Sequence, residues 1–363
     1  MIKSHIKANR LFYFRYIPYS AVISVFVLFM FAYPRVLSQG VTNGLDLCVE
    51  KVVPSLFPCI LIAGLVSELG ITDVLSKPFD KICKLLFALP GNAASIIIMS
   101  FLGGFPVGTM LAARAYEKGQ VTLNQARRLL LFCVNPGPAF TISTVGCMML
   151  GSREAGLLIY ASIMVSSFIC GVFSRFLFKA DEYVDYKQKD ENLIDFTSAF
   201  SYSVNAAGKS IVNICLWIIV FNCIISIFEF LPVTENIGLF INLFTEVTVA
   251  AEFAVSNYGL PLITFVVSFA GFCIHAQLLP YHIKLSLKYG YFFIFRVAVS
   301  LLSCIVNVLL IRIYPDYSEV FALGTKPVGA SSEISPPVCA WLMLMCGLFM
   351  IGDRYVLKRK NKQ

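Results

Sequence analysis

The chain has 363 residues, of which 58% are hydrophobic and 14% are charged, and its mean hydropathy is +0.78. Soluble proteins average about 25% charged residues, so this composition excludes a soluble globular domain and predicts an all-α, polytopic protein of the cell membrane. The net charge of +8 does not indicate nucleic-acid binding, because the basic residues flank apolar segments as topology signals do. The expected surroundings are therefore a lipid bilayer.

The twelve cysteines are scattered, and no two are spaced as C-x-x-C. Most lie in apolar runs, where a free cysteine acts as a small hydrophobic residue. The sequence therefore predicts no metal site and no disulfide framework. It also contains no G-x-S-x-G, H-E-x-x-H or P-loop motif, so we expect neither an enzyme nor a cofactor.

The N-terminal region, residues 1–44, is expected to contain one uncleaved span. Its apolar run, Ile17 to Leu37, follows basic residues that indicate a cytoplasmic N-terminus. The run is long for a signal peptide, and no small-x-small cleavage site follows it. A second span is predicted from Val52 to Leu69. The segment Asp73 to Leu89 has one apolar and one basic face, which fits either a helix on the membrane surface or an amphipathic connector.

Two interrupted apolar segments follow in the first half, residues 45–178. Gly91 to Ala115 is broken at Gly103-Gly-Phe-Pro106, and basic residues on both sides favour an even number of crossings, hence a re-entrant hairpin. Leu129 to Leu150 is broken at Asn135-Pro-Gly-Pro138 and is expected to behave in the same way. Neither of its parts reaches the ~20 residues that a spanning helix needs.

The remaining elements are predicted with simpler patterns. Residues 179–210 read as a polar connector, and residues 211–314 form the second half. The expected membrane segments after the first half are Ala155 to Phe178, Ile211 to Leu231, the ambivalent Ile237 to Val255, the interrupted Leu260 to Leu279, and Tyr291 to Ile313. Residues 315–363 are expected to hold a loop, a last span at Val338 to Val356, and a basic tail. That tail also places the C-terminus in the cytoplasm.

The two halves show the same order of segments, and each contains a Ser-Phe-x-Gly phrase at a glycine-broken segment, beginning at Ser100 and at Ser268. Transporters commonly consist of such related halves, with the substrate site where the broken segments meet. Freed backbone groups are costly in lipid unless protein or water satisfies them. We therefore expect two related halves with re-entrant or broken helices that surround a site for a small-molecule substrate.

The candidate substrate-binding residues of the first half lie at the two breaks. Close helix packing would explain Gly103, Gly104 and Gly108, but Pro106 beside them favours a discontinuous helix. At the second break we select Asn135, Gly137 and Thr141. The half-helix that begins near Ala139 would offer free N–H groups to an anion, with Thr141, Ser143 and Thr144 as further donors.

The candidates of the second half are Gly271, His275 and Gln277. A histidine in an apolar stretch is usually a packing residue, but an ionisable group inside a membrane is also a candidate for binding or proton coupling. His282 is expected at an interface, with no functional role.

Three charged residues of the second half each have two interpretations. Glu246 is either a buried carboxylate that coordinates a proton or coupling ion, or it lies with Glu252 on a surface helix. Arg296 either extends to the interface or points inward, where it would pair with Glu246 or with a substrate carboxylate.

Several of these phrases resemble the nucleoside-recognition (Gate) domain family, and within it the YlbJ-type branch of sporulation integral membrane proteins. The resemblance rests on Pro54-Ser-Leu-Phe-Pro58, Gly103-Gly-Phe-Pro-Val-Gly108, Leu131-Phe-Cys-Val-Asn-Pro-Gly-Pro138, Glu246-Val-Thr248 and the phrase from Ser268 to Gln277. It implies transport during endospore formation, with dipicolinate as the cargo in that branch, whereas other members are associated with nucleosides or have no clear cargo. The chain departs from the pattern at Met110, where the family often has a lysine.

The sequence thus predicts an integral membrane transporter or permease for a small polar or anionic molecule, with homo-oligomer formation compatible with it. The alternative is a non-transporting scaffold or assembly protein of the sporulating cell envelope, whose polar connector would bind a partner. An intramembrane enzyme is the least favoured reading.

If the breaks bind substrate, replacing Asn135 or Gln277 should abolish uptake and leave membrane insertion intact. Uptake into proteoliposomes and the yield of membrane-extracted protein would measure the two properties. Normal uptake in both variants would reject this site.

Overall fold

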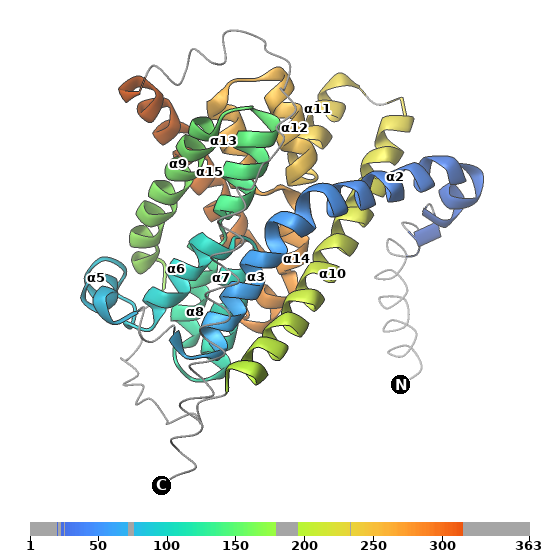
Figure 1. The fold of residues 1–363 in the computed structure, drawn as a ribbon. Helices are drawn as coiled ribbons and strands as arrows, with labels where there is room; N and C mark the ends of the chain where they lie inside the picture. The colour runs from blue at the N-terminus through green and yellow to red at the C-terminus, as the bar shows by residue number, and fades with distance from the viewer. Residues whose placement is uncertain are drawn as a thin grey trace, which may run out of the picture.

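The computed structural model describes residues 20, 23–24, 26–71, 76–178, 195–232 and 234–314, which form helices and short connections without a strand (Figure 1). The predicted all-α fold is confirmed for this part of the chain. Five of the described helices are long and apolar enough to cross a membrane, and one bent pair adds a further candidate. The predicted last span and both termini lie outside the described residues.

The first long helix runs without interruption from Pro34 to Glu68. It consists of α2 (Pro34–Leu47), the π-helical turn η1 (Cys48–Val52) and α3 (Val53–Glu68). Pro54 has no N–H for the carbonyl four residues earlier, and the helix widens to π geometry just before it. The span predicted from Val52 therefore starts well before that residue.

The next elements form a re-entrant hairpin, as the sequence predicted. After the short turns η2 (Lys77–Phe79), α5 (Asp80–Ile82) and η3 (Cys83–Phe87), α6 (Ala93–Gly103) packs against α7 (Val107–Glu117). The two ends of this pair meet, because the Asn92 side-chain amide donates a hydrogen bond to the Gln120 carbonyl, 2.9 Å away. The chain therefore enters and leaves at the same end of the molecule.

The second interrupted segment differs from the prediction, since it crosses the bundle and does not turn back. It consists of α8 (Leu123–Phe132) and the π-helix η4 (Ala139–Met149), and α9 (Arg153–Phe173) runs antiparallel beside it, ending in η5 (Ser174–Phe176). Arg128 in the middle of α8 contacts Ser174 at the end of α9, and Gly146 near the end of η4 packs on Gly156 near the start of α9. Two half-helices in series therefore match the length of one span.

The second half repeats this order in the opposite direction. Its helices are α10 (Phe196–Phe230), the pair α11 (Glu235–Phe244) and α12 (Val247–Asn257), the broken crossing α13 (Leu260–Phe269) and α14 (Gly271–Lys284), and α15 (Tyr289–Ile313). The start of α10 lies beside the end of α3, and α11–α12, bent by 120°, follows at the other end of the molecule (Figure 1). The described halves are therefore inverted with respect to the membrane.

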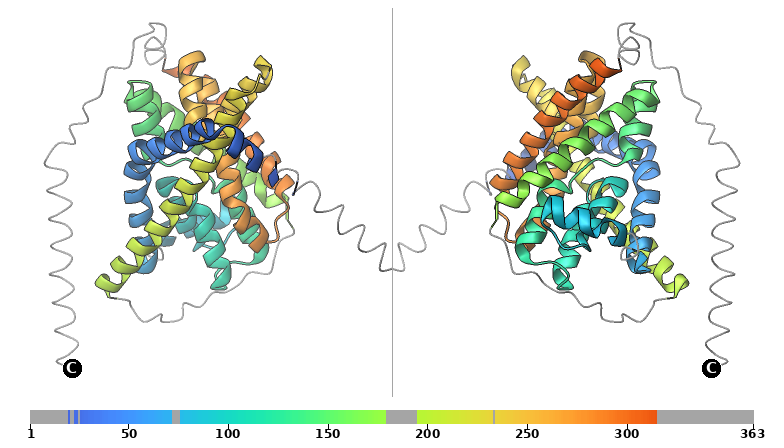
Figure 2. Two further views of the ribbon diagram at one scale, coloured as in Figure 1. Left: turned by 90° about the vertical axis from the view of Figure 1, so that its right-hand side faces the viewer. Right: turned by 90° about the vertical axis from the view of Figure 1, so that its left-hand side faces the viewer.

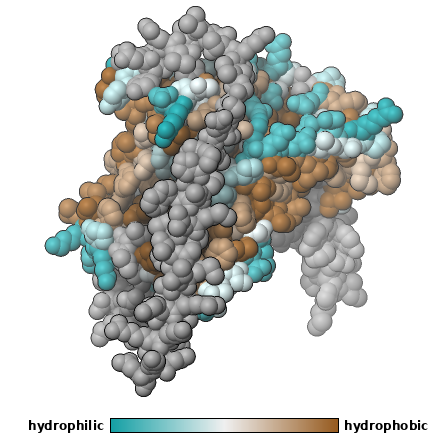
Figure 3. Space-filling model, viewed as in Figure 1, coloured by the Kyte–Doolittle hydropathy of each residue, from teal (hydrophilic) through white to brown (hydrophobic). Residues whose placement is uncertain are grey.

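The halves are joined by contacts between equivalent helices: α2 packs on α10, and α9 packs on α15 (Figure 2). Gly40 and Gly44 form a G-x-x-x-G pair that brings α2 against the α10 backbone. The outer faces of the long helices carry exposed apolar side chains, which appear as brown areas between the grey atoms of Figure 3. This surface suits contact with lipid chains.

The G-x-x-x-G contact predicts a position-specific loss of stability. A Cβ atom at Gly44 would lie 2.8 Å from Ile219 Cα, whereas nothing lies within 4 Å of a Cβ at Gly208 of α10. We expect G44A to reduce the free energy of unfolding by about 1–3 kcal/mol, as overpacking does. G208A should be neutral or slightly stabilising, because alanine favours helix. Thermal unfolding in detergent micelles measures both, and equal melting temperatures would contradict the packing.

Candidate functional site

The two breaks of the first half touch each other. Gly104 has φ +70° and packs on Gly137, where an added Cβ would come within 2.7 Å of the Gly137 nitrogen. An added Cβ on Gly108 would come within 2.1 Å of the Cys133 carbonyl oxygen. Only glycine permits approaches this close. These glycines therefore let the hairpin α6–α7 seat its tip in the break of α8–η4.

The two breaks of the second half touch in the same way. Gly271 has φ +62°, and its face lies against the backbone of Thr245 to Val247, where α11 and α12 meet. The Cys273 N–H donates to the Thr245 carbonyl, 2.9 Å away. Glu246 accepts hydrogen bonds from the N–H groups of Thr248 and Val249, at 2.8 and 2.9 Å, and so caps α12.

A small cavity lies where both pairs of breaks come together. Its walls are formed by side chains and backbone from α3, α10 and all four broken segments: Val52, Ser55, Leu56, Phe105, Gly137, Phe140, Ile214, Ile218, Glu246, Val247, Thr248, Ile274 and Gln277. The cavity has a volume of about 30 Å³, enough for a water molecule or two and too small for a solute. The structure therefore shows this centre in a closed form.

The polar groups at the cavity are mostly hydrogen-bond acceptors. Gln277 is 3% exposed, its amide nitrogen contacts Cys273 Sγ at 3.5 Å, and its side-chain oxygen has no partner. Glu246 is 1% exposed and adds a carboxylate. Ser55 donates its hydroxyl proton to the Lys51 carbonyl, 2.6 Å away. A buried acceptor without a partner is costly, so the Gln277 oxygen is available to a ligand that donates a hydrogen bond.

Of the residues selected from the sequence, Gly137, Glu246 and Gln277 line the cavity. The others form the breaks around it. Asn135 donates to the Phe132 carbonyl at 2.8 Å and accepts from the Ser167 hydroxyl, so its amide holds α8 to α9. Thr141 donates to the Gly137 carbonyl at 3.0 Å, and Ser143 is exposed on the outer face of η4. Glycines 103, 104, 108 and 271 and Pro106 shape the backbone.

The two buried histidines lie away from the cavity. His275 bonds through Nδ1 to the Tyr289 hydroxyl at 2.8 Å and through Nε2 to the Phe269 carbonyl at 3.1 Å. It thereby caps the end of α13, as Asn135 caps the end of α8. His282 lies in the last turn of α14, is 2% exposed and packs on Phe292.

The alternatives for the charged residues are resolved by burial. Glu246 sits at the α11–α12 bend, so the surface-helix interpretation is wrong for it, whereas Glu252 pairs with Lys51 and its side chain is 42% exposed. Arg296 is fully buried, so it does not extend to the interface. It does not pair with Glu246 either, because its guanidinium donates to the Val134 carbonyl and to Ser268 Oγ.

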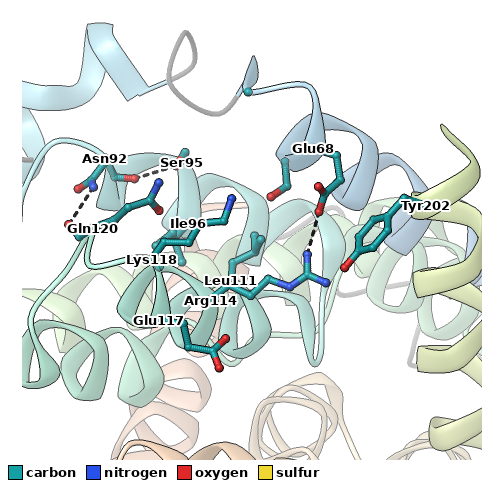
Figure 4. A pocket seen from close by; sticks show the side chains of 13 residues that line it. Glu68, Asn92, Ser95, Ile96, Leu111, Arg114, Glu117, Lys118, Gln120 and Tyr202 are labelled. Carbon is teal, nitrogen blue, oxygen red and sulfur yellow. Dashed lines mark hydrogen bonds and ion pairs between the residues drawn. The ribbon is translucent and has the colours of Figure 1, made fainter. Parts of the chain in front are cut away.

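A polar vestibule lies at the end of the molecule where the hairpin α6–α7 opens (Figure 4). Its volume is about 260 Å³. Arg114 bonds to Glu68 at 3.1 Å and lies 6.0 Å from the centre of the Tyr202 ring, so it joins α7 to α3 and α10. A wider groove of about 900 Å³ continues past Arg114 along α10 to Ser210. A single helical turn separates Ser210 from Ile214 at the central cavity.

Sequence reasoning missed the aromatic and helix-terminal residues of the cavity. Phe105 follows the selected Gly104, Phe140 precedes the selected Thr141, and Thr248 stands in the acidic motif with Glu246. Ser55 stands inside the Pro54-Ser-Leu-Phe-Pro58 phrase. Their proximity to glycines and prolines that break helices was the sequence signal that could have identified these residues. No group of three or more metal-ligating side chains occurs among the residues that the structure describes.

Comparisons with known proteins agree with this architecture. Residues 49–176, from η1 to η5, match the Gate family model, described as nucleoside recognition. The chain is 21% identical to the sporulation integral membrane protein YlbJ of Bacillus subtilis (strain 168) over 384 aligned positions, which cover 90% of this chain and 94% of that protein. An uncharacterized protein of Alkalihalophilus pseudofirmus is 25% identical over 156 residues, 42% of this chain and 33% of that protein. No solved structure matches the chain.

The fold and the central breaks therefore define a multi-pass membrane protein of inverted halves, whose first half matches the Gate nucleoside-recognition model over residues 49–176. Along most of its length the chain is a homologue of a sporulation integral membrane protein. The resemblance seen in the sequence motifs is confirmed.

The contact between the first two breaks can be tested with a matched pair of glycines. Gly104 and Gly119 have φ values of +70° and +69°, but only Gly104 has backbone within reach of an added Cβ. We expect G104A to destabilise the protein by about 1–3 kcal/mol more than G119A, because overpacking adds to the strain. Detergent melting temperatures measure the difference. Equal loss in both variants would show that the breaks do not depend on this contact.

Proposed function

We propose that this protein is a transporter that moves a small, ring-containing polar solute through the point where its four helix breaks meet. The observation that carries the proposal is the closed cavity lined by residues of both halves, with the unpaired Gln277 oxygen and the Glu246 carboxylate in its wall. In transporters of inverted repeats, discontinuous helices bind the substrate at this position. Glycine packing explains the contacts between breaks, but it does not require buried acceptors beside them.

The chemistry of the cavity favours a nucleoside-like cargo over dipicolinate. Gln277 offers an oxygen without a partner, and Glu246 offers a carboxylate whose Oε1 has a long contact of 3.3 Å with the Thr248 hydroxyl. Such acceptors match the hydroxyl and amino groups of a nucleoside. Phe105 and Phe140 supply apolar surface for a ring. A dicarboxylate would bring negative charge toward Glu246, and no basic side chain lines the cavity within the described residues. The Gate description, nucleoside recognition, agrees with this choice, and the homology to YlbJ supports a role in sporulation.

The distribution of charge supports an orientation for transport. The end that bears the vestibule carries most of the basic residues near the membrane ends: Lys77, Lys81, Lys84, Lys118, Arg127, Arg128, Arg175, Lys284 and Lys288. The opposite end carries Arg35, Arg153 and Arg312. Cytoplasmic loops are enriched in lysine and arginine. The vestibule then opens to the cytoplasm, and the groove that continues from it along α10 ends one helical turn from the cavity.

Alternating access follows from the inverted halves. A cavity of about 30 Å³ must widen before it admits a solute, since ligand sites of this kind have about 300 Å³ or more. Movement of the hairpin tips away from α3 and α10 would open the cavity to one side, and the equivalent movement in the other half would open it to the other.

The test is uptake of labelled nucleosides and of dipicolinate into proteoliposomes that contain the full chain. We expect saturable nucleoside uptake, reduced about tenfold or more in E246Q and in Q277L, because each removes an acceptor in a buried site. E252Q is the matched control, since Glu252 lies on the same helix but pairs at the surface. Dipicolinate uptake alone would overturn the cargo class. Absence of any saturable uptake would favour the scaffold alternative.

A further inference from the structure

Arg296 is the largest fully buried side chain of the described residues, with no exposed surface, and it lies in the interior of α15. Its Nη1 donates to the carbonyl oxygen of Val134, and its Nη2 lies 3.3 Å from Ser268 Oγ. Val134 belongs to the break between α8 and η4, whereas Ser268 lies in the last turn of α13. One guanidinium from the second half therefore joins broken segments of both halves.

The surroundings of this charge contain no carboxylate partner. Among the described residues, every ion pair involves other groups, and the Arg296 Nε has no hydrogen-bond partner. Ser268 in turn contacts the hydroxyl of Ser303, 3.3 Å away, which is neutral. An unpaired buried charge is strongly unfavourable unless its environment is arranged to stabilise it. The stabilising groups must therefore be dipoles.

Two helices end next to the residues that the guanidinium contacts. Helix α8 ends at Phe132, two residues before Val134, and α13 ends at Phe269, one residue after Ser268. Each C-terminus carries a partial charge of about −0.5 from its aligned peptide dipoles and free carbonyls. The partial charges of two such ends add up to about −1, which balances the single positive charge of one guanidinium. The breaks therefore create a site for a single positive charge, and the chain fills this site itself.

We propose that Arg296 is a tethered cation that occupies the position where unwound helices would otherwise hold a coupling metal cation. It is a positioning residue, because it does not line the central cavity. Its two contacts hold the break of α8–η4 beside the end of α13. In combination with the proposed function, this assignment predicts transport without a requirement for an alkali cation at this point.

The first experiment is independent of transport. Removing the side chain in R296A leaves a cavity and uncompensated carbonyls, and we expect the melting temperature of the purified full chain to fall by about 5 °C or more. Millimolar methylguanidinium should restore at least half of this loss in a saturable manner, while choline should not. R312A is the matched control, because Arg312 is exposed on the same helix.

R296M separates the charge from the packing, since methionine fills much of the volume without charge. We expect R296M to lose stability as well, with no response to methylguanidinium, because its side chain blocks the site. Equal stability of R296M and the unmodified protein, or failure of methylguanidinium to stabilise R296A more than R312A, would overturn the tethered-cation assignment. Neither outcome depends on whether the protein transports anything.

The second experiment replaces sodium by potassium or choline during nucleoside uptake. We expect less than a twofold change in the initial rate for the unmodified protein. A strict requirement for sodium or lithium would overturn the inference and leave the transport function intact. Absence of uptake in all media would instead count against the proposed function, and the stability experiment would then decide the role of Arg296 alone.

Discussion

Backbone groups freed inside a bilayer must find partners, and this requirement determines the centre of the protein. Each broken helix leaves carbonyls at its C-terminal end and N–H groups at its N-terminal end. The structure satisfies several of them with side chains close to the breaks in the chain: Asn135 at the end of α8, His275 at the end of α13, and Glu246 at the start of α12. Polar residues that read as binding candidates thus include several that keep the breaks in shape.

Because most polar side chains near the breaks cap helix ends, the central cavity contains few free polar atoms. Most donors and acceptors near the breaks are used internally, and the Gln277 oxygen remains. Arg296 also satisfies groups at the breaks. Its positive charge lies beside the partial negative charges of two helix ends that belong to different halves. A movement that separates these two broken segments would have to break at least one of the two contacts of Arg296.

Burial and helix breaking were accessible from sequence because they depend on local composition. The Gly103-Gly-Phe-Pro106 turn, the hairpin around it and the apolar span of α15 follow from residue type and spacing. The Asn135-Pro-Gly-Pro138 break was also visible in the sequence. The sequence did not show whether the helices on its two sides form a re-entrant hairpin or one continuous crossing. That difference depends on how α9 packs along both arms, through Ser174 at one end and Gly156 at the other.

The sequence by itself determined the membrane class, the helical breaks and the family, since apolar length and proline–glycine chemistry act within a few residues. Only the tertiary structure decided that the halves are inverted, that Glu246 and Gln277 share a cavity while Asn135 and His275 do not, and that Arg296 lies inside. These facts depend on contacts between residues more than a hundred positions apart, such as Arg296 with Val134. The direction of a side chain in such a contact is set by packing, which no local pattern encodes.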